Sequence, residues 1–134
     1  RLDFLTSGVL VAALGDEHSA AAQLAQAQFA GRLVSKLYMC LCVGASLGPV
    51  GAKGQVTSGL KKIRVGRDAY RVFASPGGRE AETSFVVQAS FAVASLQGPS
   101  VCHPTEVFTL LGARPGTGRT HQIRVHLASI GRPL

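Results

Sequence analysis

The sequence predicts a mixed α+β fold in which strands outnumber helices. Two segments, residues 17–30 and 120–130, carry apolar side chains near helical spacing, whereas residues 36–43 alternate from one position to the next as strands do. The chain has 134 residues, of which 46% are hydrophobic and 16% charged. This balance is typical of one small globular domain and not of a disordered chain.

The first strand is expected at Gly8–Leu14, a short continuous apolar run whose length suits a strand buried on both faces. Gly15-Asp16 ends this run, and Asp16 is predicted to be the N-cap of the next segment. That segment, residues 17–30, is rich in alanine and is predicted to be a helix. Its apolar positions near helical spacing are Ala20, Leu24, Ala27 and Phe29.

The segment Lys36–Val43 predicts a strand that is covered on both sides, because both sets of alternating side chains are largely apolar. In such a strand Cys40 and Cys42 point to one face. Together with Cys102 they make three cysteines, an odd number without the spacing of a disulfide framework. We therefore expect buried free thiols and an intracellular reducing compartment, with no metal site and no cofactor.

The middle of the chain is rich in glycine and then in basic residues. Residues 44–59 hold five glycines and a proline and predict a long loop or insertion, and residues 75–79 predict a turn. Residues 61–71 carry five basic side chains against one acidic one. This basic stretch fits two alternatives equally well: a solvated hairpin, or a surface that binds nucleic-acid phosphates. The phosphate-binding candidates are Lys61, Lys62, Arg64 and Arg67.

The last third of the chain predicts two strands and a helix. Glu82–Phe91 and Glu106–Ala113 favour β structure and are expected to pair antiparallel across a loop that contains Gln97-Gly98-Pro99. After the tight loop Pro115–Gly118, Thr120–Ile130 has helical spacing. Ile123, Leu127 and Ile130 share one face of this helix, Thr120 is expected to cap its start, and Gly131 is expected to end it.

The formal net charge of +7 indicates an anionic partner, and ten of the fourteen basic residues are arginines. Arginine offers planar, bidentate donors suited to phosphates and base edges, so nucleic acid is the expected class of partner. No apolar stretch approaches the ~20 residues that a membrane-spanning helix needs. We therefore expect no membrane association.

Three places in the sequence are candidates for chemistry. Asp3 precedes a Thr-Ser-Gly turn, where it is either an ordinary turn residue or a carboxylate held open to a cleft. Tyr38 is either a core tyrosine or an aromatic face for a base. The Gly-rich turn before Thr120 opens a helix whose first amides and nearby arginines form an anion site, unless it is a plain surface helix.

Two alternative functions for the Gly-rich turn fail on spacing. A phosphate-binding P-loop needs four residues between its glycines and a following lysine, whereas five residues separate Gly112 from Gly118 and Arg119 follows. A zinc-binding helix needs histidines four residues apart, but His121 and His126 are five apart. Neither a nucleotide-triphosphate enzyme nor a zinc enzyme is therefore predicted.

Together these stretches resemble the RluA-type pseudouridine synthases. The family's signature around its catalytic aspartate, R-L-D-x-x-T-S-G, matches Arg1–Gly8 in full, and T-G-R-T-H-Q-I-R-V-H-L-A-x-x-G-x-P matches Thr117–Pro133. Two weaker motifs match as well: K-x-Y at Lys36–Tyr38, and G-K-x-A-x-T at Gly78–Thr83 with Arg79 in place of the lysine. Arg132 stands where many members carry histidine.

The resemblance implies a mostly antiparallel sheet with helices packed on it and an active-site cleft across the sheet. It implies that Asp3 is the catalytic aspartate, that Tyr38 stacks on the target uracil and assists proton removal at C5, and that Arg124 pairs with Asp3. Arg1 would hold the flipped-out nucleotide or fill the gap it leaves. The other expected substrate-binding residues are Thr6, Arg119, Thr120, His121, Gln122 and Ile123.

The expected function is isomerisation of uridine to pseudouridine in rRNA, tRNA or mRNA by a monomer without a cofactor. The alternative is a catalytically silent RNA-binding module on the same fold. Because the chain opens at Arg1 without a methionine and stops just after a helix end, we expect residues 1–134 to be the central part of a longer catalytic domain. These residues do not identify the target RNA.

Overall fold

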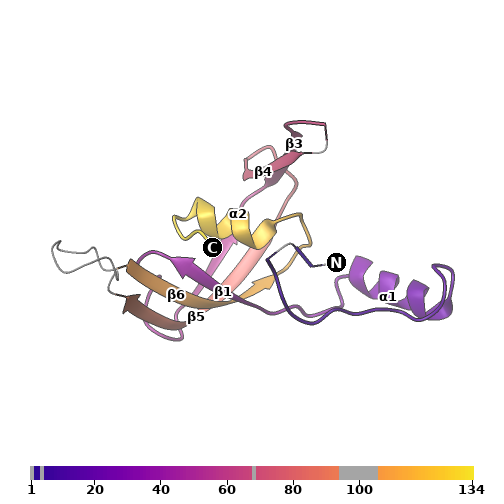
Figure 1. Cartoon of the computed structure of the whole chain (residues 1–134), viewed down its shortest axis with the longest axis horizontal. Coiled ribbons are helices and arrows are strands. Elements are labelled where there is room, and N and C mark those ends of the chain that lie inside the picture. The colour runs from indigo at the N-terminus through magenta and orange to yellow at the C-terminus, as the bar shows by residue number, and fades with distance from the viewer. Residues whose placement is uncertain (1, 4, 68, 94–105) are drawn as a thin grey trace. The chain divides into compact units, whose positions relative to one another are not determined.

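The computed structural model describes residues 2–3, 5–67, 69–93 and 106–134. The chain divides into two compact units, residues 1–35 and residues 36–134, which Figure 1 shows in indigo to purple and in purple to yellow. Each unit has its own internal contacts.

The first unit contains one helix, α1 (Ala20–Ala30), within its described residues. Asp16 was predicted to be the N-cap, but the cap is Ser19, whose hydroxyl accepts a hydrogen bond from the Ala22 amide at 3.3 Å. The Asp16 carboxylate instead accepts from the His18 amide at 2.9 Å, which forms a turn ahead of the helix. The helix therefore begins three residues later than the predicted segment.

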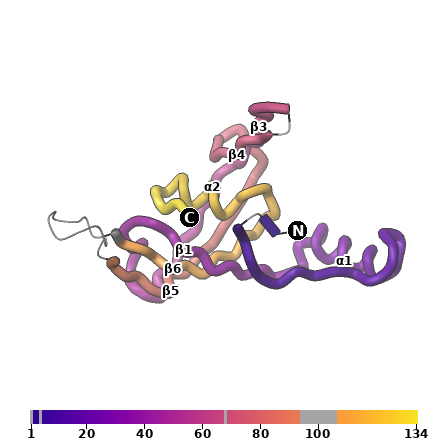
Figure 2. The backbone as a smooth tube through the Cα atoms, viewed as in Figure 1, coloured from indigo at the N-terminus to yellow at the C-terminus, as the bar shows by residue number. Residues whose placement is uncertain are grey.

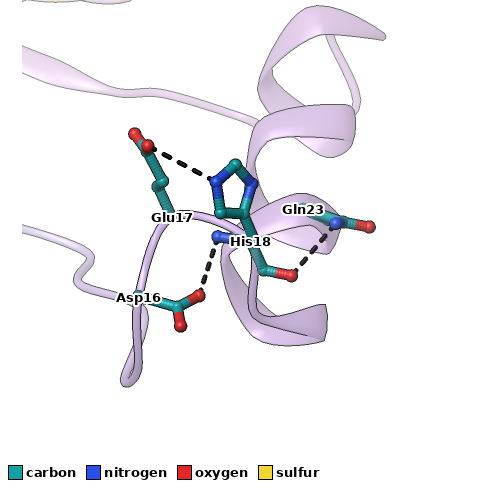
Figure 3. A network of polar contacts seen from close by, with 4 residues as sticks. All are labelled: Asp16, Glu17, His18 and Gln23. Carbon is teal, nitrogen blue, oxygen red and sulfur yellow. Dashed lines mark hydrogen bonds and ion pairs between the residues drawn. The ribbon is translucent and has the colours of Figure 1, made fainter.

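A small polar cluster surrounds this turn (Figure 3). Glu17 and His18 approach to 3.6 Å, and the side-chain amide of Gln23 donates to the His18 carbonyl at 3.0 Å. These contacts are exposed, so each contributes little to stability.

The predicted strand at Gly8–Leu14 is wrong. These residues have no strand conformation, and Val9 and Leu14 are 90% and 88% exposed. A strand needs a neighbour for its backbone amides and carbonyls. The described residues of the first unit contain no other strand, so the apolar composition of the run cannot place it in a sheet.

The second unit is built on a four-stranded antiparallel sheet in the order β1-β6-β5-β2. The strands are β1 (Tyr38–Val43), β2 (Lys53–Thr57), β5 (Glu82–Val93) and β6 (Glu106–Pro115). The predicted antiparallel pairing of β5 with β6 is confirmed, with an irregularity between Val87 and Ala89. The loop with Gln97-Gly98-Pro99 lies outside the described residues.

The Gly-rich stretch 44–59 is a loop only in its first part, because β2 occupies its end. The basic stretch forms a separate hairpin of β3 (Leu60–Arg64) and β4 (Tyr70–Ala74). The predicted turn at 75–79 is confirmed, and it is closed by a hydrogen bond from the Gly78 amide to the Ser75 carbonyl at 2.9 Å. Figure 2 shows this hairpin as a loop of the backbone standing apart from the main sheet.

The helix α2 (Gln122–Ser129) packs on one face of the sheet (Figure 1). As predicted, Leu127 is buried, and Ile123 and Ile130 pack beside it. The predicted end is confirmed, because Gly131 adopts φ +72° and the Arg132 amide returns to the Leu127 carbonyl at 2.8 Å. The predicted start is wrong, because the N-cap is His121 and not Thr120.

The core lies between α2 and one face of the sheet. Its buried members are Cys40, Cys42, Val56, Phe85, Val87, Leu111, Ala113 and Leu127. On the other face of β1, Met39, Leu41 and Val43 are exposed, so the prediction that this strand is covered on both sides is wrong. Within the described residues of this unit α2 is the single helix, and it covers one face of the sheet. None of the helices among the described residues has the length and apolar character to span a bilayer.

A glycine is required at position 54, because the ring of Phe85 on the neighbouring strand packs against its Cα. A Cβ at Gly54 would lie 2.3 Å from Cζ of Phe85. We predict that Gly54→Ala lowers the free energy of unfolding by about 1–3 kcal/mol through overpacking. Urea denaturation of the full-length protein measures this, with Gly77→Ala as the control because a Cβ there meets nothing within 4 Å. Equal midpoints for the two variants would contradict the prediction.

Candidate functional site

The helix-covered side of the sheet brings Tyr38 and Arg124 to the same region. Tyr38 and Cys40 share a face of β1, and Tyr38 is half-buried against the core. The pKa of Cys40 is raised to about 11, chiefly by burial and to a smaller degree by the neighbouring Cys42, while the Arg124 guanidinium acts to lower it. The charge of Arg124, itself half-buried on α2, therefore lies close to β1.

Lys36 extends this group toward the loop before α2. It lies two residues before Tyr38, and its Nζ is 3.9 Å from the position of a Cβ on Gly118. Sequence reasoning did not select Lys36 as a site residue. The signal was available in the strand alternation, because positions 36, 38 and 40 fall on one side when β1 is continued backwards.

The loop from Gly116 to Arg119 is fastened to the first residues of β5. The Gly116 amide donates to the Glu82 carbonyl at 2.9 Å, and the Glu82 amide donates to the hydroxyl of Thr117 at 3.3 Å. The guanidinium of Arg119 donates to the Glu80 carbonyl at 3.2 Å. These bonds fix the Gly-rich turn, which was predicted to take part in an anion site.

Gln122 was predicted to bind substrate, but in this structure its side chain is 4% exposed and faces inward. Its Oε1 accepts from the Thr117 hydroxyl at 2.6 Å and from the Arg119 amide at 3.0 Å. Its Nε2 donates to the Glu82 carbonyl at 2.7 Å and to the Thr83 hydroxyl at 3.1 Å. The amide is thus fully used by the protein's own groups.

His126 continues this network one helical turn later. Its Nδ1 lies 2.9 Å from the Thr83 hydroxyl and its Nε2 lies 3.0 Å from the Ser58 carbonyl. Both Thr83 and His126 have no exposed surface. Sequence reasoning did not identify this network, because its partners come from segments up to 68 residues apart along the chain.

The remaining candidates near α2 lie at its surface or against the core. Thr120 and His121 are exposed, and Ile123 packs against the core. His121 adopts the left-handed conformation at φ +52°, as does Leu5 at φ +68° in the first unit. For a residue with a Cβ this conformation costs about 1–2 kcal/mol, and such residues gather at functional sites. These two positions fall in the two most specific sequence motifs, whereas Arg32, which adopts φ +57°, lies outside both.

Asp3 and Thr6 lie in the first unit, whereas Tyr38 and Arg124 lie in the second. Asp3 and Thr6 are half-buried, and the Thr6 amide donates to the Asp3 carbonyl at 3.0 Å, which closes a turn ahead of the Thr-Ser-Gly segment where a turn was predicted. Arg1 lies outside the described residues. Each unit therefore contains some of the predicted site residues.

The basic hairpin carries exposed cations around an exposed tyrosine. Lys61, Lys62 and Arg67 are exposed, and the Nζ of Lys62 lies 4.2 Å from the ring centroid of Tyr70. Arg64 holds the turn instead, because its guanidinium donates to the Gly66 carbonyl at 2.9 Å and to the Arg67 carbonyl. Sequence reasoning missed Tyr70, although an aromatic residue among basic ones is a nucleic-acid signal.

The described residues contain no group of three or more histidine, cysteine, aspartate or glutamate side chains able to hold a metal ion. Cys40 and Cys42 are free, buried thiols, as predicted. The polar groups gathered near α2 thus suit hydrogen bonding and charge stabilisation.

Comparison with known proteins decides the family. The family model for RNA pseudouridylate synthase matches residues 1–129. This chain belongs to the RNA pseudouridylate synthase family. It is 36% identical over its full length to the uncharacterised RNA pseudouridine synthase YhcT of Bacillus subtilis and 33% identical to RNA pseudouridine synthase 1 of Arabidopsis thaliana. The chain spans 38% and 48% of those two proteins.

Solved structures of this family share the fold. Human RNA pseudouridylate synthase domain containing 1 superposes with a TM-score of 0.74 at 28% identity, over 99% of this chain and 50% of that one. Human RNA pseudouridylate synthase domain containing 4 gives a TM-score of 0.50 at 22% identity, over 84% of this chain and 40% of that one. The second likeness concerns the fold alone. The predicted α+β fold with an antiparallel sheet is confirmed.

The raised pKa of Cys40 predicts a thiol that resists alkylation when the protein is folded. A pKa of about 11 instead of 9.0 lowers the thiolate fraction near pH 8 about a hundredfold, before access is considered. Iodoacetamide labelling followed by peptide mass spectrometry measures the rate in folded and urea-unfolded protein. The rate in folded protein should rise about tenfold per pH unit and level off only near pH 11, whereas the rate in unfolded protein should level off near pH 9. Equal rates for the two states at pH 8 would refute the assignment.

Proposed function

We propose that the full-length protein converts uridines in RNA to pseudouridine. The observation that carries this proposal is the family match over residues 1–129, which includes the complete motif around Asp3 and most of the stretch Thr117–Pro133. Relatives named for this activity act, by their names, on the ribosomal large subunit in Vibrio cholerae and on tRNA in Vibrio vulnificus. RNA is accordingly the proposed partner.

The reaction breaks the C1′–N1 bond of uridine, turns the base and joins C5 to C1′. A uridine stacked in a helix has to be extruded first, at a cost of a few kcal/mol. Tyr38 is proposed to stack on the extruded uracil, since base–aromatic stacking contributes roughly 1–3 kcal/mol. Its half-buried place at the start of β1, on the face that carries Cys40, supports this role.

Asp3 is proposed to be the catalytic carboxylate and Arg124 its partner. A carboxylate in a closed pocket stays ionised only if a cation lies nearby, because burial favours the neutral form. Arg124 suits this task because it is half-buried and its charge lies toward the sheet. The carboxylate then either takes a proton or attacks the sugar as a nucleophile.

The β3–β4 hairpin is proposed to bind the RNA backbone without reading its sequence. Lys61, Lys62 and Arg67 are exposed, so each can neutralise a phosphate. Arg64 contributes indirectly by holding the turn in shape. Phosphate contacts of this kind position RNA and leave specificity to other parts of the protein.

Replacing the proposed catalytic carboxylate tests the activity. We predict that Asp3→Asn abolishes pseudouridine formation, measured as tritium release from RNA labelled at uracil C5, while RNA affinity stays within about tenfold. The matched control is Asp16→Asn, because Asp16 is exposed in the same unit and asparagine can keep its bond to the His18 amide. Turnover by Asp3→Asn at the rate of the control would overturn the proposed role. Wild-type protein that binds RNA but releases no tritium would favour a catalytically silent RNA-binding module.

The hairpin makes a separate prediction about salt. Lys61→Ala should weaken RNA binding and reduce the slope of log K against log salt by about 0.7–0.9, the value for one lost phosphate contact. Lys53→Ala is the control, because it removes the same charge from an exposed position on β2. Filter binding over a salt series gives both slopes. Identical slopes for the two variants would exclude Lys61 from the RNA contact.

A further inference from the structure

The hydrogen bonds of Gln122, Thr83 and His126 have only one consistent direction. The Arg119 amide is a donor and the Glu82 carbonyl an acceptor, so they fix which end of the Gln122 amide is oxygen and which is nitrogen. The Ser58 carbonyl can only accept, so Nε2 donates to it, and Nδ1 of the same tautomer accepts the proton of the Thr83 hydroxyl. The ring proton then lies on Nε2, where it meets the Ser58 carbonyl.

This chain of bonds begins and ends on backbone groups and leaves no buried member without a partner. No described, buried side-chain nitrogen or oxygen lacks a hydrogen bond. Such satisfied networks impose a single arrangement, since any other arrangement leaves a buried polar atom without a hydrogen bond, at a cost of about 1–3 kcal/mol. The network therefore has the rigidity needed to set the position of α2.

Local signals do not fix the start of α2. The helix has eight residues, and its N-cap His121 makes no side-chain capping bond. A helix this short is marginal on its own and depends on tertiary contacts. Gln122 and His126 lie four residues apart, so they anchor one flank of α2 to Thr83 on β5 and to Ser58.

Arg124 leaves the helix on the other flank. It is two residues from both anchors, about 200° around the helix from Gln122. The strand order places β1 and β5 on either side of β6, and Cys40 of β1 is the residue whose thiol responds to the Arg124 charge. A small rotation of α2 about its axis would thus move the guanidinium while leaving Leu127 in the core.

We propose that Thr83, Gln122 and His126 are positioning residues for the isomerisation, and that their hydrogen bonds set the rotation of α2 and hence the placement of Arg124. This inference rests on the proposed function. It predicts an effect on the chemical step rather than on RNA binding, because none of the three side chains faces the surface. Misplacement of a reacting group by about 1 Å can lower a rate by up to a hundredfold.

The test is Thr83→Val in the full-length protein, since valine keeps the shape and removes the hydroxyl link. We expect kcat to fall at least about tenfold while KM for RNA stays within about threefold. Thr109→Val is the matched control: Thr109 is equally buried on the same face, and its hydroxyl donates to the Gly44 carbonyl at 3.3 Å, outside the network of Thr83, Gln122 and His126. Thr83→Ser, which restores the hydroxyl, should recover kcat to within about threefold.

Each outcome decides the question. If the wild type is active and kcat is unchanged in Thr83→Val, the positioning role is overturned and the proposed function stands. The same holds if Thr83→Val and Thr109→Val lose kcat equally. A wild type without pseudouridine formation overturns both. Long-range proton–nitrogen NMR of the wild type reads the tautomer of His126 even if Thr83→Val does not fold. A ring proton on Nδ1 instead of Nε2 would contradict the proposed direction of the hydrogen bonds and so overturn the inference.

Discussion

The buried amide of Gln122 is the contact on which the arrangement of the second unit depends. Its four hydrogen bonds join the loop before α2, the first residues of β5 and the helix itself. Because all four lie away from water, losing one partner leaves a buried polar atom unsatisfied, which is more costly than the bond is favourable. His126 extends the same chain to Ser58, at the base of the basic hairpin. One small network thus joins α2, which carries Arg124, to the loop before it, to β5 and to Ser58.

The apolar core complements this network and does not replace it. Leu127 packs α2 against the sheet. Burial of apolar surface is not directional, so it fixes neither the rotation of a short helix nor its first residue. The hydrogen bonds supply that direction. The left-handed His121 marks the place where the tertiary bonds, and not the helix's own cap, decide where α2 begins.

The two units divide the proposed chemistry. The first unit carries Asp3 on a turn, and the second carries Tyr38 and Arg124 on elements that share a core. The hairpin adds exposed positive charge, of which Arg64 is already committed to the turn. In this proposed division β1 and α2 position the aromatic and cationic groups, and the exposed lysines are proposed to attract RNA independently of its sequence.

The sequence alone determined the elements whose signals are local: the β5–β6 pair, the apolar face of α2 and its glycine end at Gly131, and the basic hairpin. Its motifs also determined the family, because they are matches of residue type and order. Only the tertiary structure decided which apolar runs pair, so that Gly8–Leu14 forms no strand and β1 is covered on one face. It also decided that Gln122 faces inward toward Thr83. Composition and spacing describe what each residue prefers, whereas pairing and burial depend on segments tens of residues away, which no local pattern contains.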